Sequence, residues 1–233
     1  MRTNILICIF FIIALCSCSG DADPIYSCDK TIDLWVKNHI EEIQTMDRTD
    51  WLKMDDKLKS ASYRAFSQNQ KIDFWKEKLS EVMTLDWNEE ELEHIQKVSD
   101  FLDTHTTFFG EKPLSDEQNN ELDLFFYKWA TYAFDNLKWE KQTVYAIACT
   151  GLQLLSKNGD IGTIPSIAEE AEKMTKSSEQ QIIPECDCHL SAWNLMACTP
   201  QISWGCEESK CEDDTWGCGW VGLQSCDGLC VPL

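Results

Sequence analysis

The stretch that decides the fold reads SDEQNNELDLFFYKWATYAFDNL, residues 115–137. Its first four residues fit a capping box, because Ser115 can accept a hydrogen bond from the third helical amide and Gln118 can reach back. Apolar side chains then recur every three or four residues: Leu122, Phe125, Phe126, Trp129, Ala133 and Leu137. Such a stripe is typical of a helix packed on a core. The stretch therefore predicts a long amphipathic helix whose aromatic rings are core rather than a ligand platform.

The same periodicity extends over residues 27–178, for which we expect an all-helical domain without a β-hairpin. Asn88 and the acidic triplet after it suit a helix start, because a side-chain acceptor and negative charge both favour exposed amide donors. Residues 139–156 are expected to be helical too. A turn should follow from Gly159 to Pro165, where a last helix begins.

The N-terminus has the parts of a bacterial lipoprotein signal peptide, residues 1–17. Arg2 precedes an apolar run from Ile5 to Leu15 that is too short to span a bilayer. Leu15-Cys16-Ser17-Cys18 then fits the lipobox, which predicts lipidation of Cys18 and a membrane as partner. Cys16 is a poorer candidate because bulky Leu15 precedes it. The alternative is ordinary secretion with cleavage near Ser19.

Residues 18–26 form an acidic tether, and its Ser19-Gly20-Asp21-Ala22-Asp23 resembles the export signal of Bacteroidetes surface lipoproteins. These features predict an outer-membrane or cell-surface location. The whole chain is strongly acidic, with 40 Asp and Glu against 20 Lys and Arg and a formal net charge of −20. Such a surface repels phosphate backbones, so nucleic acid is not expected as a partner.

Thirteen cysteines are present, of which Cys8 and Cys16 would leave with the signal and Cys18 would carry lipid. Ten remain, an even number in an exported protein, which predicts disulfides. Eight of them fall after a linker at residues 179–185, in a module spanning residues 186–233: Cys186, Cys188, Cys198, Cys206, Cys211, Cys218, Cys226 and Cys230. Cys28 and Cys149 could close a fifth bridge in the helical domain.

We therefore expect a mainly α protein, with an N-terminal helical bundle followed by a small disulfide-rich C-terminal module of little regular structure. So short a module cannot bury a core of its own, and crosslinks must supply the missing stability. Zinc is the rival explanation. It is disfavoured because Cys226 and Cys230 have the spacing of a tight ligand pair but no second tight pair lies close by, and His189 alone does not complete a site. No metal, cofactor or catalytic residue is predicted.

Two groups of residues resemble a known family. In the tail these are Cys186-Asp187-Cys188, the segment Trp216-Gly217-Cys218-Gly219-Trp220 and the segment Ser225-Cys226-Asp227-Gly228-Leu229-Cys230. In the helical part they are Tyr63-Arg64-Ala65-Phe66 and the segment from Lys71 to Leu79. The chain resembles the bacteriocin fulvocin C-related family of Bacteroidetes lipoproteins, which implies a helical carrier with a bacteriocin-like tail. The tail departs from the family in its apolar first half and acidic middle.

Two functions are compatible with these features. One is a surface protein that acts on competing bacteria through the stapled module, with target contacts made by Trp193, Trp204, Trp216 and Trp220. These rings could equally fill the core of the module. The other is a non-toxic binding or adhesion module for a receptor, protein or glycan. Residues 184–233 hold eight acidic side chains and one lysine, which argues against direct attack on anionic lipid. An enzyme is not expected, because His39, His94, His105 and His189 are scattered.

Overall fold

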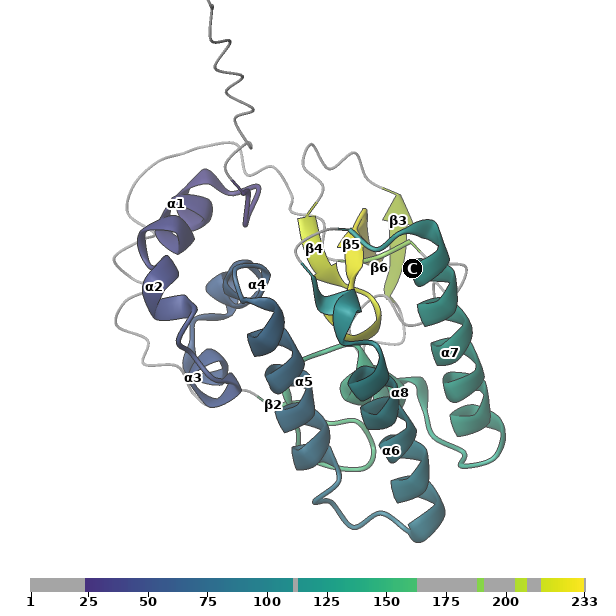
Figure 1. Ribbon diagram of the computed structural model, residues 1–233. Coiled ribbons are helices and arrows are strands. Elements are labelled where there is room, and N and C mark those ends of the chain that lie inside the picture. The colour runs from purple at the N-terminus through teal and green to yellow at the C-terminus, as the bar shows by residue number, and fades with distance from the viewer. Residues whose placement is uncertain (1–23, 111–112, 163–187, 191–203, 209–214, 233) are drawn as a thin grey trace, which may run out of the picture.

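The computed structural model describes residues 24–110, 113–162, 188–190, 204–208 and 215–232. Its helices are α1 (Lys30–Asn38), α2 (Ile40–Ile43), α3 (Arg48–Lys53), α4 (Asp56–Arg64), α5 (Gln68–Val82), α6 (Glu89–Thr104), α7 (Asp116–Asp135) and α8 (Lys141–Ala148), with short 3₁₀ turns η1 (Thr106–Phe109) and η2 (Trp220–Gly222). Its strands are β1 (Gln153–Leu154), β2 (Ile161–Gly162), β3 (Trp204–Glu208), β4 (Thr215–Cys218), β5 (Gln224–Cys226) and β6 (Gly228–Pro232). The predicted mainly α class with a small disulfide-rich C-terminal part is confirmed (Figure 1).

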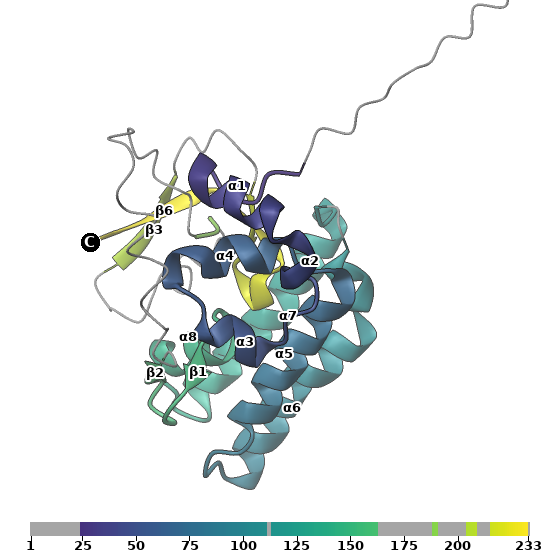
Figure 2. The ribbon, with the colours of Figure 1, turned by 90° about the vertical axis from the view of Figure 1, so that its left-hand side faces the viewer.

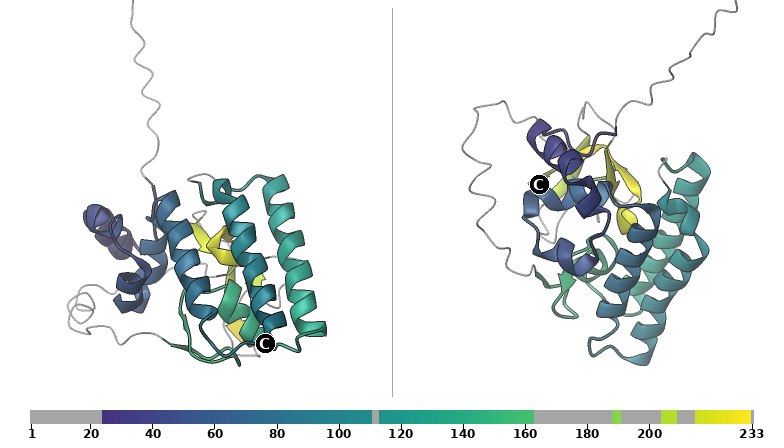
Figure 3. Two further views of the ribbon diagram at one scale, coloured as in Figure 1. Left: turned by 60° about the horizontal axis from the view of Figure 1, so that its bottom comes forward. Right: turned by 60° about the vertical axis from the view of Figure 1, so that its left-hand side comes forward.

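Three long helices, α5, α6 and α7, form the body of the protein (Figures 1 and 3). Each begins with a capping box that satisfies exposed amides. Those at Ser115 and Asn88 start the helices where the sequence predicts, with Gln118 and Glu91 as the reciprocal partners. A third box, between Ser67 and Gln70, starts α5.

The aromatic stripe of α7 faces the core as predicted. Leu122, Phe126, Trp129 and Ala133 are buried, whereas Phe125 lies at the edge of the core and is only partly covered. Phe126 and Trp129 meet edge to face with ring centroids 6.0 Å apart, one of the arrangements that aromatic pairs prefer. The stripe is thus the main apolar surface that holds α7 on its neighbours.

The all-helical expectation is wrong at residues 149–162. Helix α8 ends at Ala148, and β1 and β2 pair as a short antiparallel hairpin beside it (Figure 2). The turn contains Asn158-Gly159, a hairpin signal that the helical interpretation overlooked. Gly159 has φ of 87°, and a Cβ there would lie 2.4 Å from the Gln142 backbone, so only glycine fits. The predicted helix after Pro165 lies outside the described residues.

Buried cations from α3 and α5 hold this hairpin in place. Arg48 Nε donates to Gly151 O at 2.9 Å, and Lys78 Nζ donates to Leu152 O. Glu81 accepts from Arg48 Nη1 at 2.7 Å and from the Leu154 amide at 3.1 Å. Burial, with the Arg48 charge as a second cause, lowers the pKa of Lys78 to about 7, although Glu81 acts in the opposite direction. Charged side chains therefore replace helical hydrogen bonds for the backbone of this segment.

Candidate binding site: an interhelical groove beside the docked tail

Disulfide bonding of the tail is confirmed for four of the predicted cysteines. Cys188 bonds to Cys206 with Cα atoms 6.0 Å apart, and Cys218 bonds to Cys226 with Cα atoms 5.2 Å apart. The first bridge ties the segment at Cys188 to β3, and the second crosses the β4–β5 hairpin. Cys230 faces Cys206 in the register of β6 and β3, whereas Cys186, Cys198 and Cys211 lie outside the described residues.

The bridge expected between Cys28 and Cys149 is wrong, because Cys149 carries a free thiol. The two residues belong to elements with different neighbours. Cys28 precedes α1, which packs on α4, whereas Cys149 ends α8, which packs on α5, α7 and β1. Burial raises the pKa of the Cys149 thiol, which disfavours the thiolate form at neutral pH.

The loop between β4 and β5 inserts into the helical core. Gly219, Val221 and Gly222 all have positive φ values, between 45° and 66°, which reverses the chain tightly around Trp220. Trp220, Val221 and Leu223 join the same buried cluster as the helices. The strands of the tail lie between α4 and α7 in Figure 1, where this loop points toward the helices.

Trp220 is the anchor of this loop. Its ring is 3% exposed and stacks on Phe126 of α7, with centroids 4.7 Å apart and planes 4° from parallel. The ring therefore fills the core, the alternative role considered for the tail tryptophans, and is not available to a partner. Trp193 lies outside the described residues, and so do the side chains of Trp204 and Trp216.

Polar contacts fix the orientation of the loop. Tyr63 donates a hydrogen bond to Val221 O at 3.4 Å and accepts one from Trp75 Nε1 at 2.9 Å. Gln224 Nε2 donates to Asp123 Oδ1 at 3.0 Å, while its Oε1 accepts from the Trp220 amide at 3.0 Å. Burial raises the pKa of Asp123, which the hydrogen bond from Gln224 partly opposes. The tail is thus docked by both apolar and polar groups.

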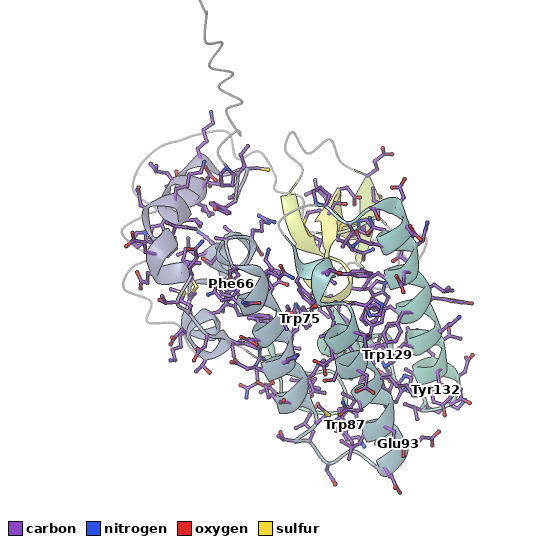
Figure 4. The ribbon with its side chains drawn as sticks, in the orientation of Figure 1. Phe66, Trp75, Trp87, Glu93, Trp129 and Tyr132 are labelled. Carbon is purple, nitrogen blue, oxygen red and sulfur yellow. A yellow bond between two sulfur atoms is a disulfide. The ribbon has the colours of Figure 1, made fainter. Side chains whose placement is uncertain are left out.

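A groove of about 500 Å³ runs between α6 and α7. Its volume is within the range of small-molecule sites. Figure 4 labels Trp129, which lies between α7 and α6, and Tyr132 on α7, and both rings stack on His94 of α6. The lining residues come from both helices: His94, Lys97, Phe101, His105, Glu121, Leu124, Phe125, Lys128, Trp129 and Tyr132.

One part of the lining is the pair of His94 and Trp129. The rings stack with centroids 5.1 Å apart, and Tyr132 stacks on the imidazole as well. His94 Nε2 lies 2.9 Å from Trp129 O, which can only accept, so this nitrogen carries the proton. Within the described part of the chain, no group donates to the buried Nδ1. Burial lowers the pKa of His94 to about 4, so the ring is neutral at pH 7.

The opposite end of the groove is also aromatic. Phe101 stacks on Phe125 with centroids 4.1 Å apart and on His105 at 3.9 Å. His105 Nε2 lies 3.2 Å from Glu121 Oε1, so a polar pair closes this end. Leu124 on the rim is 53% exposed.

Sequence reasoning missed this groove, although its residues follow helical spacing. On α6 the lining falls at His94, Lys97, Phe101 and His105, and on α7 it falls at Glu121, Phe125, Lys128 and Tyr132. Each set is one stripe along its helix. A mixed stripe of aromatic, basic and histidine side chains is the signal that could have indicated a binding face.

Among the described residues, His, Cys, Asp and Glu do not gather in a group of three that could hold a metal ion. The helices in the described ranges are too short or too polar for a membrane span. No family model, curated protein or solved structure matches the chain, so the groove and the docked tail are interpreted from their own chemistry.

Proposed function

We propose that the protein is an exported, lipid-anchored binding protein whose α6–α7 groove takes a small ligand. The groove itself carries this proposal, because it combines a ligand-sized volume with aromatic walls and a few charged groups. The docked tail supports it. Trp220 in the core and Gln224 on Asp123 make the tail part of the body that carries the groove. The proposal is one of ligand binding, the class of function that the sequence analysis offered as its alternative.

A thermal-shift screen of small molecules against the purified mature protein tests the groove. Leu124→Asp adds a charge at an exposed position of the lining, and Leu34→Asp makes the same change at an exposed position of α1. We expect some compounds to raise the melting temperature of wild type and Leu34→Asp but not of Leu124→Asp. If the Leu124→Asp shifts equal those of wild type for every hit, the groove is not the site.

The membrane anchor is the second part of the proposal, and it rests on the lipobox at Leu15-Cys16-Ser17-Cys18. Several acyl chains on Cys18 would hold the protein durably on a membrane. Metabolic labelling with an alkyne fatty acid should mark wild type and Cys16→Ser, whereas Cys18→Ser should be unlabelled and found in the medium or periplasm. Equal labelling of Cys18→Ser would overturn lipidation at this residue.

An antibacterial function is the second candidate, favoured by the tail motifs Trp216-Gly217-Cys218-Gly219-Trp220 and Ser225 to Cys230. Because Trp220 is held by the helices, the tail would act as part of the whole chain or after release from it. Growth of related strains with oxidised mature protein over a range of doses tests this function. Inhibition that disappears after reduction and alkylation would support it, and normal growth at all doses would exclude it for those strains.

A further inference from the structure

We propose that the groove recognises a small aromatic carboxylate, with its ring on the aromatic wall and its carboxylate between Lys97 and Lys128. The inference rests on the proposed function, since it requires that the groove binds a ligand. It adds the chemical class of that ligand. Two features lead to it: the placement of the two lysines and the apolar character of the remaining lining.

Lys97 and Lys128 lie at the same level of the groove on opposite helices. Two contacts across the helices bracket them, His94 with Trp129 on one side and Phe101 with Phe125 on the other. These contacts set an antiparallel register in which residue 97 of α6 falls opposite residue 128 of α7. Both side chains line the groove, and Lys97 Nζ lies 5.1 Å from the centroid of the Tyr132 ring, one turn along α7 from Lys128.

Neither lysine takes part in an ion pair within the described part of the chain, although the protein carries a net charge of −20. The nearby carboxylates have other partners. Glu90 accepts from Tyr132 OH at 2.7 Å, and Glu121 lies 3.2 Å from His105. Glu93 also lies near Tyr132, so the Tyr132 end of the groove carries negative as well as positive side chains. Two cations that line one groove without carboxylate partners attract an anion into it.

The rest of the lining favours a flat apolar body over a sugar. Phe125 and Leu124 are only partly covered and offer carbon alone to a ligand, whereas Phe101 is buried between Phe125 and His105. Lys97 Nζ lies 5.1 Å from the centroid of the Tyr132 ring. Most polar side chains of the lining already have partners. His105 bonds to Phe101 O and to Glu121, and Tyr132 OH donates to Glu90. Few groups besides the two lysines are therefore left to pair with sugar hydroxyls. Hydroxyls buried without partners would cost binding energy, whereas an aromatic ring can pack on Phe125 and Leu124.

Isothermal titration calorimetry of the mature protein with three probes tests the inference. The probes are 2-naphthoate, its uncharged counterpart 2-naphthamide, and glucuronate as an acidic sugar. We expect 2-naphthoate to bind most tightly. Lys97→Gln and Lys128→Gln should each weaken it about three- to fivefold, the effect of one partly exposed ion pair. Lys57→Gln makes the same change at an exposed position of α4 and should leave the affinity for 2-naphthoate unchanged.

The other outcomes separate this inference from the proposed function. Equal binding of 2-naphthamide, or wild-type affinity in both groove lysine variants, would overturn anion recognition while leaving a binding groove. Tighter binding of glucuronate would replace the aromatic class by an acidic sugar. If none of the three probes binds but the thermal-shift screen yields hits that Leu124→Asp abolishes, the aromatic carboxylate inference is overturned and the proposed binding function stands. If no hit depends on Leu124, both fall.

Discussion

His94 and Trp129 each donate a hydrogen bond to the backbone carbonyl of the other, and both distances are 2.9 Å. The imidazole of α6 and the indole of α7 thus join the two helices twice, with their rings stacked between the bonds. Each donor belongs to one helix and each acceptor to the other. This reciprocal pair fixes the spacing of the helices at the groove.

Replacing Trp129 by Phe keeps an aromatic ring but removes the indole donor and part of the packing. We expect a loss of about 1–3 kcal/mol in the free energy of unfolding. Trp35→Phe on α1, where the ring is partly exposed, is the matched control and should cost less than about 1 kcal/mol. Urea denaturation followed by far-UV circular dichroism measures both. Equal losses would show that the cross-helix bond contributes nothing specific.

Protonation of His94 should destabilise the protein at acid pH. The pKa is about 4 in the folded state, below its ordinary value of 6.5, so the unfolded chain binds the proton first. Between these values stability therefore rises with pH and falls as the solution is acidified. In His94→Phe this part of the pH dependence should be absent. Urea denaturation of both proteins across this pH window measures the slopes, and identical slopes would contradict the assignment.

Removing the Trp220 ring should destabilise the helices, although the residue lies in the cysteine-rich tail. Trp220→Ala leaves a cavity against Phe126 and should cost about 3–5 kcal/mol. Glu207→Ala, at an exposed position of β3, should change stability by less than about 0.5 kcal/mol. Thermal unfolding followed by far-UV circular dichroism, which reports helix content, measures the loss. An unchanged helical transition in Trp220→Ala would mean that the tail folds apart from the helices.

The buried Lys78 should give the protein a second pH dependence, in the alkaline range. Its folded pKa of about 7 lies below the ordinary 10.5, so between these values the unfolded chain holds the proton and the folded chain does not. Stability of wild type should therefore rise through this window relative to Lys78→Met, by on the order of a few kcal/mol. Denaturation at neutral and alkaline pH measures the difference, and a constant difference would be contrary evidence. Lys57→Met should stay within about 0.5 kcal/mol of wild type at neutral pH.

Local patterns predicted much of the helical part. The capping box at Ser115 and the helix start at Asn88 were readable because the interacting groups lie within three residues and need no tertiary contact. The β1–β2 hairpin was missed, although Asn158-Gly159 is a local signal. Its backbone is also held by Arg48 and Lys78, which lie far away in the sequence.

The sequence by itself determined the helices, their buried stripes and the presence of disulfides, because capping, periodicity and cysteine content act over short distances. Tertiary structure decided which stripes face each other. It placed Trp220 on Phe126 and turned the α6 and α7 stripes into a groove lined by both Lys97 and Lys128. Side-chain packing between distant segments selects these neighbours, and no local rule encodes that choice.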